Sequence, residues 1–168
     1  MKTEVNRYYL EIHSPQEINE LQTSSIEYNI LNINPPNFQL NKFFYKNIGK
    51  KHRWTDRLIW SDTDWIEYVE DKKIDTFVLK KKNDMAGYFE LIHHTKTNEI
   101  EIAYLGLLDE YLNQKLGSFL LYSALKKSFL KKPKRVWVHT CSLDHKNALN
   151  NYLSRGMKVF KEETLYLN

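Results

Sequence analysis

Apolar residues recur along the chain with two different spacings, and these predict the order of its elements. Residues 8–12 and 26–33 are predicted as short strands with a helical turn between them, and Pro35-Pro36 closes the second. From residue 38 to 48 the apolar positions fall near the 3.6-residue period of a helix. A second helix follows Ser61 or Asp62, either of which can cap its first turn.

From residue 76 onward, runs rich in aromatic and β-branched residues alternate first with turns and then with helices. A meander of three strands comes first, with turns at 83–84 and 96–98. A long helix then begins near Leu116 and ends before Pro133, which cannot continue a helix. The predicted strands cover residues 76–79, 86–92, 99–108, 135–140 and 159–167, and a last helix covers 145–155.

This order of helices, antiparallel strands and a final β–α–β–α–β run is typical of an α+β domain with a mixed sheet. The 168 residues fit one domain with a single core. We therefore expect one domain over residues 1–168, in which residues 1–25 form an N-terminal strand and helix extension.

Composition narrows the class of protein. Hydrophobic residues make up 42% and aromatic residues 14%, which indicates a globular chain. No apolar run approaches the ~20 residues of a membrane span, and the N-terminus has no apolar signal-peptide core, so we expect a cytoplasmic protein. The single cysteine, Cys141, excludes an internal disulfide and argues against a metal site, as does the lack of ligand partners for His93-His94.

The net charge of +4 raises the question of a nucleic-acid partner. Lysines cluster at 80–82 and 126–132, yet solvated surface lysines are the more common reason for such clusters. The sequence has no motif with interleaved aromatic residues suited to reading bases. A basic surface also suits an anionic cofactor, so no nucleic-acid partner is expected.

The segment with the clearest chemistry is 101–118, which is predicted as a strand, a short loop and the start of a helix. The first turn of a helix presents unpaired backbone N–H groups and the positive end of the helix dipole, which suit a pyrophosphate. Gly117 permits a ligand to approach the backbone closely. Many α/β proteins contain such a unit, so the unit alone is weak support for a ligand site.

Several motifs together resemble the GNAT superfamily of N-acetyltransferases. The superfamily's cofactor loop, Arg/Gln-x-x-Gly-x-Gly/Ala, aligns with residues 112–117, and its Ala-x-x-x-Tyr-x-x-x-Gly-aromatic signature aligns with Ala148, Tyr152 and Gly156. The resemblance implies an α+β GNAT-like fold, with a mixed, mostly antiparallel central sheet flanked by helices on both faces. Longer phrases resemble one uncharacterised bacterial branch, namely residues 53–58, 87–90, 101–104 and 136–145.

Two positions depart from the cofactor-loop pattern. Leu112 stands where the superfamily has Arg or Gln, and Lys115 stands where it has its first glycine. A side chain at 115 crowds a phosphate if the position requires positive φ, whereas its charge can instead contact that phosphate. The sequence leaves both alternatives open.

The resemblance implies acetyl-CoA as the cofactor. Leu107 and Leu108 would hold the pantetheine arm through backbone hydrogen bonds, and a nearby backbone N–H would polarise the thioester oxygen. His145 or Asn147 would hydrogen-bond the cofactor, although His145 could equally be only the first turn of the helix. The pyrophosphate would lie against Leu112, Asn113, Gln114, Lys115, Leu116, Gly117 and Ser118.

The resemblance also implies two catalytic residues. Glu101 is the expected general base, with Glu90 on the neighbouring strand as its competitor, although Glu101 could equally be a surface carboxylate. Tyr152 is the expected proton donor to the departing thiolate, with packing under the sheet as the alternative. His139 and Cys141 are interpreted as structural groups.

The charged and aromatic stretch 52–60 corresponds to a region that often lines the acceptor pocket in the superfamily. We predict acceptor contacts for Arg53, Trp54, Arg57 and Glu90, and either arginine could pair with an acceptor carboxylate. A packed loop with internal ion pairs is the alternative.

The predicted activity is direct acetyl transfer from acetyl-CoA to a primary amine of a small molecule. Transfer to a protein or peptide amine, and a CoA-binding module without catalysis, are the alternatives. GNAT domains often pair, so a homodimer is compatible with the resemblance.

Overall fold

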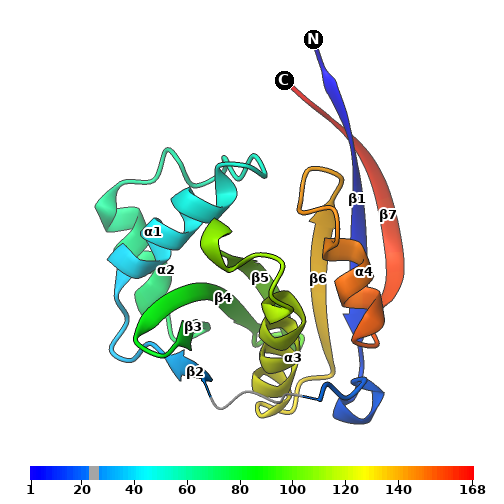
Figure 1. Cartoon of the computed structure of the whole chain (residues 1–168). Coiled ribbons are helices and arrows are strands. Elements are labelled where there is room, and N and C mark those ends of the chain that lie inside the picture. Colours follow the sequence, from blue (N-terminus) through cyan, green and yellow to red (C-terminus); the bar gives the residue numbers. More distant parts are fainter. Residues whose placement is uncertain (23–26) are drawn as a thin grey trace.

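The computed structural model describes residues 1–22 and 27–168, which form one seven-stranded sheet in the order β2-β3-β4-β5-β6-β1-β7 (Figure 1). Every neighbouring pair is antiparallel except β5 and β6. The strands are β1 (Thr3–Ile12), β2 (Tyr28–Asn32), β3 (Ile74–Lys81), β4 (Asp84–His94), β5 (Glu99–Leu107), β6 (Arg135–Cys141) and β7 (Lys158–Leu167). The helices are α1 (Phe38–Gly49), α2 (Asp62–Glu70), α3 (Leu116–Phe129) and α4 (Ala148–Ser154), with short 3-10 turns η1 (Pro15–Glu17) and η2 (Asp109–Tyr111).

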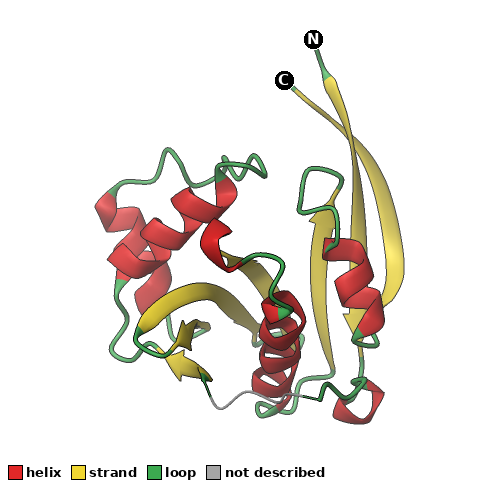
Figure 2. Cartoon of the chain, viewed as in Figure 1, coloured by secondary structure: helices red, strands yellow, loops and turns green. Residues whose placement is uncertain are grey.

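The fold is therefore α+β with a mixed, mostly antiparallel sheet, which confirms the predicted class (Figure 2). The sequence-based order of elements holds throughout. The strand predicted over 26–33 covers Tyr28–Asn32, and Ile26 itself lies outside the described residues. The helix predicted over 145–155 begins only at Ala148, so residues 145–147 belong to the turn before it.

The first half of the sheet consists of β2 and the meander β3 to β5, and α1 and α2 cover one of its faces. The ends of both helices follow from their sequences: the Asn37 side chain accepts from the Gln39 N–H, and Ser61 forms a reciprocal capping box with Asp64. Phe44 and Ile48 of α1 pack on that face of the sheet.

The larger hydrophobic core lies on the other face, between the sheet and α3. Apolar residues of α3 spaced by three and four positions, such as Leu121 and Leu125, are fully buried against Ile100 and Val138 of the strands. The two faces of the meander are therefore covered by different helices.

β1 lies inside the sheet, between β6 and β7. It pairs with β6 from Arg7↔Cys141 to Ile12↔Val136 and with β7 from Thr3↔Leu167 onward. The first and last strands of the chain run side by side at one end of the molecule (Figure 1). Residues 23–25 of the expected N-terminal extension lie outside the described residues.

The one parallel pair is short, and its ending creates an opening in the sheet. β5 and β6 pair from Glu99↔Arg135 to Glu101↔Trp137 only, although β5 runs on to Leu107 and β6 to Cys141. We call the divergence beyond this last pair the fork. Within the described residues, it leaves the β6-facing edge of β5 beyond Glu101 without a strand partner.

A β-bulge sits next to the fork. Glu90 pairs with Tyr104 and Leu91 with Ile102, so Ala103 is the extra residue on β5. The bulge reverses the alternation of side chains. Tyr104 consequently packs on the α1 side of the sheet, against Tyr45, and not with Ile102 under α3.

None of the helices within residues 1–22 and 27–168 has the length and apolar character needed to cross a membrane. The described residues also hold no cluster of three or more His, Cys, Asp or Glu side chains arranged for a metal ion.

Candidate active site

A cleft of about 380 Å³ opens at the fork. Its walls come from the free edge of β5, the loop between α1 and α2, the first turn of α3, β6 and the turn before α4. Many of the predicted site residues line it, namely Arg53, Trp54, Leu107, Leu112, Asn113, Lys115, Gly117, Ser118, His145, Asn147 and Tyr152.

Three predicted cofactor residues do not line the cleft. Leu116 is buried in the core under the sheet, and the Leu108 N–H donates to the Ala86 carbonyl at 2.9 Å. The Gln114 side chain accepts from Lys81 at 3.2 Å and donates to the backbone of Glu110. The Leu108 N–H and the Gln114 side chain therefore already have partners within the protein.

The loop before α3 has an unusual backbone. Asn113 and Lys115 both have φ of 61°, in the left-handed region, and no side chain caps the helix that Lys115 begins. Backbone that alternates between left- and right-handed conformations turns successive N–H groups into an anion-binding concavity. Lys115 therefore occupies the positive-φ position at which the superfamily pattern has glycine.

Gly117 lies in the first turn of α3 and faces the cleft. A Cβ at this position would meet only the Asn151 side-chain nitrogen, at 3.8 Å, which is an ordinary contact. That nitrogen donates to the Gly117 carbonyl at 3.1 Å. A glycine inside a helix costs about 0.5–1 kcal/mol relative to alanine, and no packing within the protein requires one here.

Tyr152 projects from α4 into the same cleft. The residue is 7% exposed, and its hydroxyl has no hydrogen-bond partner among the described residues. Burial, and after it the Asp144 carboxylate, raise the pKa of Tyr152 well above its ordinary value. The hydroxyl therefore keeps its proton at neutral pH and can donate it to a ligand.

On the α1 side, the cleft is bounded by Trp54, Tyr104 and Asp144, which we call the acceptor wall. The Trp54 and Tyr104 rings meet edge to face, with centroids 4.7 Å apart. The indole N–H donates to Asp144 at 3.5 Å, and Asp144 also accepts from the Thr140 hydroxyl at 2.6 Å. These contacts join the loop after α1 to the end of β6 across the cleft.

Arg57 and Glu90 lie behind the acceptor wall and not in the cleft. The guanidinium is 2.9 Å from the Glu90 carboxylate, which is completely buried and also accepts from Tyr68 at 2.8 Å and Asn41 at 2.9 Å. The Arg57 guanidinium also lies 4.5 Å from the Tyr104 ring centroid. We predicted acceptor contacts for this pair, and the structure places the two charges against each other inside the protein, away from the residues that line the cleft.

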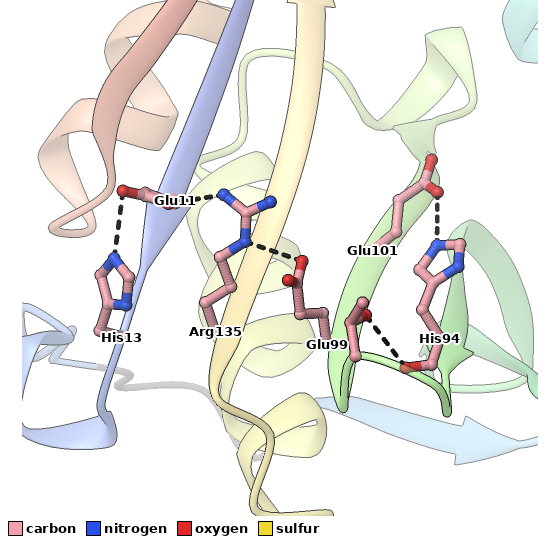
Figure 3. Close-up of polar contacts among 7 residues, drawn as sticks. Glu11, His13, His94, Glu99, Glu101 and Arg135 are labelled. Atoms are coloured by element: carbon pink, nitrogen blue, oxygen red, sulfur yellow. Dashed lines mark hydrogen bonds and ion pairs between the residues drawn. The ribbon is translucent and has the colours of Figure 1, made fainter.

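Glu101 lies at the base of the fork. His94 Nε2 is 3.0 Å from its carboxylate, and the Glu101 side chain is 15% exposed (Figure 3). Glu101 does not line the cleft. Nearby, Arg135 bridges Glu99 at 2.8 Å and Glu11 at 2.7 Å, which ties β5, β6 and β1 together where the fork closes (Figure 3).

Several cleft residues were not among the predicted site residues. Asp56 and Tyr104 line it, as do Arg7 from β1 and both His139 and Cys141 from β6. The bulge hides Tyr104 from a reading based on alternation, and Arg7 reaches the cleft only through long-range strand pairing. His139 and Cys141 share a strand face by their spacing, which was the available signal. Burial raises the pKa of the Cys141 thiol, so the thiol stays protonated.

Comparison with known proteins fits this geometry. The model of the acetyltransferase (GNAT) family matches residues 30–157, and the chain belongs to that family. No curated protein matches it.

Solved structures share the fold at low sequence identity. A GCN5-related N-acetyltransferase from Sphaerobacter thermophilus is 12% identical with a TM-score of 0.72, over 98% of this chain and 52% of that one. Another from Kribbella flavida is 13% identical with a TM-score of 0.66, over 96% and 56%. The chain thus spans about half the length of these two proteins. An aminoglycoside acetyltransferase from an uncultured soil metagenomic sample, in complex with trehalose, is 14% identical with a TM-score of 0.63, over 77% and 87%.

Proposed function

We propose that the chain transfers an acetyl group from acetyl-CoA directly to a primary amine of a small molecule. The observation that carries this proposal is the uncapped first turn of α3 at the mouth of the cleft, with Gly117 at a position where the protein itself has no need of a glycine. Membership of the acetyltransferase family supports acyl transfer in general.

The described residues fit the cofactor. The N–H groups at Gly117 and Ser118 and the loop at 113–115 suit a pyrophosphate, and the Lys115 ammonium adds a charged contact. The free edge of β5 from Ala103 to Leu107 offers backbone groups to the pantetheine arm in place of the occupied Leu108 N–H. Acetyl-CoA, when bound, supplies the acetyl group as an activated thioester.

Tyr152 is the proposed proton donor to the departing sulfur, because it lines the cleft and its protonated hydroxyl has no partner among the described residues. Arg53 and Trp54 are proposed to contact the acceptor, and Arg57 and Glu90 to hold the acceptor wall from behind. The fold shared with an aminoglycoside acetyltransferase supports a small-molecule amine as the acceptor.

Release of free thiol from acetyl-CoA, measured with a panel of small primary amines and lysine-containing peptides, tests this function. We expect thiol release that requires at least one small amine. Turnover only with the peptides would instead support a protein or peptide acceptor. CoA binding by calorimetry without thiol release for any amine would indicate a binding module, to which the departures at Leu112 and Lys115 would then be relevant.

A further inference from the structure

His139 extends into the cleft from the diverging part of β6. It lies two residues beyond Trp137, the last β6 residue that pairs with β5, and therefore on the same strand face. Its ring is exposed and lines the cleft, with the Tyr9 ring of β1 beside it at 5.7 Å between centroids. A group on this face can meet a ligand that enters between the two strands.

His139 differs from the other five histidines of the chain. Each of those has a polar partner: Glu11 for His13, the Leu143 carbonyl for His52, Asn98 for His93, Glu101 for His94 and the Asn147 N–H for His145. Among the described residues, the His139 ring has no hydrogen-bond or ion-pair partner. Both ring nitrogens are therefore available to a ligand.

Charged groups of both signs surround this ring. Protein encloses it on several sides although it opens to the cleft, and this burial, followed by the Arg7 guanidinium of β1, lowers the pKa of His139. The carboxylates of Glu101 on β5, Asp144 after β6 and Asp56 before α2 act in the opposite direction. The net direction is downward from 6.5, so the ring is unprotonated at neutral pH.

We propose that His139 is the general base that takes the proton from the acceptor ammonium in the cleft. This inference rests on the proposed acetyltransferase function. Glu101, the base expected from the family resemblance, is outside the cleft lining and already contacts His94. In this proposal its charge acts on the imidazolium form of His139 and not on the acceptor.

The proton and bond balance is simple. The acceptor R–NH3⁺ gives one proton to a ring nitrogen of His139 and becomes R–NH2, whose lone pair attacks the thioester carbon. The C–N bond forms, the C–S bond breaks, and sulfur leaves with the electron pair. The second proton from the nitrogen reaches the sulfur by way of the Tyr152 hydroxyl, and His139 returns the first proton to solvent.

The kinetic test uses the amine that the protein turns over fastest in the panel. His139→Gln is expected to lower kcat/KM about 100-fold at pH 7, with the loss shrinking at high pH where the amine deprotonates unaided. His139→Ala should regain activity when imidazole is added, which a purely structural role would not produce. Glu101→Gln and His94→Gln are the matched controls, with much smaller losses expected.

A second readout needs neither cofactor nor acceptor. In an NMR titration of the free protein, the ring signals that disappear in His139→Gln should titrate with a pKa below 6.5. In the turnover assay with the wild type, the acid limb of the kcat/KM profile should follow the same pKa. A ring still protonated at pH 7 would overturn the proposal. So would an unchanged rate in His139→Gln or a larger loss in Glu101→Gln.

The two proposals fail in different ways. If His139→Gln turns over as fast as the wild type, the assignment of His139 as the base is rejected and the proposed acetyltransferase function stands. The absence of thiol release from wild type with every amine removes the proposed function, and the base with it.

Discussion

The two sides of the cleft are built by different means. The side proposed for the cofactor consists of backbone: the free edge of β5, the left-handed residues before α3 and the uncapped first turn of that helix. The acceptor wall consists of side chains, held by edge-to-face rings and a shared carboxylate. Backbone groups tolerate a change of side chain as long as the conformation persists. A wall of side chains changes its shape and charge with each substitution.

This difference explains why the departures at Leu112 and Lys115 leave the cofactor side recognisable. Lys115 adopts the positive φ that glycine favours, so the loop keeps the required path at a cost of roughly 1–2 kcal/mol. The shape of the acceptor wall depends on neighbouring side chains, because the Tyr104 ring also packs against the guanidinium of the buried Arg57–Glu90 pair.

The largest effect is expected behind the acceptor wall. Glu90→Ala leaves the Arg57 guanidinium buried without a counter-charge and removes an acceptor from Tyr68 and Asn41. Breaking a buried pair in this way costs about 3–5 kcal/mol, which urea denaturation would measure as a lower free energy of unfolding. The double variant Arg57→Met/Glu90→Leu should recover most of the loss. A loss below about 1 kcal/mol would show that the pair does not support the wall.

An intermediate effect is expected between the two sides, at Tyr152. Tyr152→Phe removes the free hydroxyl and nothing that holds the fold, so turnover should fall about 100-fold while CoA affinity by calorimetry stays nearly constant. Tyr166→Phe, at a residue that is 61% exposed, is the matched control and should leave the rate unchanged. Equal rates in the two variants would exclude Tyr152 from the reaction.

The smallest effect, and the most specific for the cofactor side, is expected at Gly117. Gly117→Ala should stabilise the protein by about 0.5–1 kcal/mol, because alanine is the better helix residue and finds only one contact at 3.8 Å. The same methyl group should weaken CoA binding. Thermal unfolding and calorimetry would measure the two changes.

Gly106→Ala is the control for that result. An added Cβ there would lie 2.6 Å from the Ile48 side chain, so this variant should lose stability. Undiminished CoA affinity in Gly117→Ala would contradict the placement of the pyrophosphate at α3.

The sequence predicted the elements well because their signals are local. The helical period of α1, the cap at Ser61 and the strand-loop-helix unit before α3 are all contained in short windows. The backbone of the side proposed for the cofactor could be predicted for the same reason, since its geometry follows from one strand end and one helix start.

The acceptor wall was harder to predict, because its composition depends on contacts between distant segments. A charged residue in the 52–60 stretch can face a ligand or a buried partner, and only the Arg57–Glu90 contact decides between them. One extra residue on β5 turned Tyr104 to the other face of the sheet. Arg7 and Cys141 are strand partners although they lie far apart in sequence, and neither segment alone predicts that pairing.

The position of β1 has a consequence for how the chain reaches this fold. Because β1 fills the space between β6 and β7, its ten residues can make none of their ladder hydrogen bonds until the segment beyond Arg135 has been synthesised. Strand pairings between such distant segments form slowly, since a long loop must close first. The meander can therefore assemble early, whereas the part of the sheet that holds His139 is complete only after β1 has paired with β6.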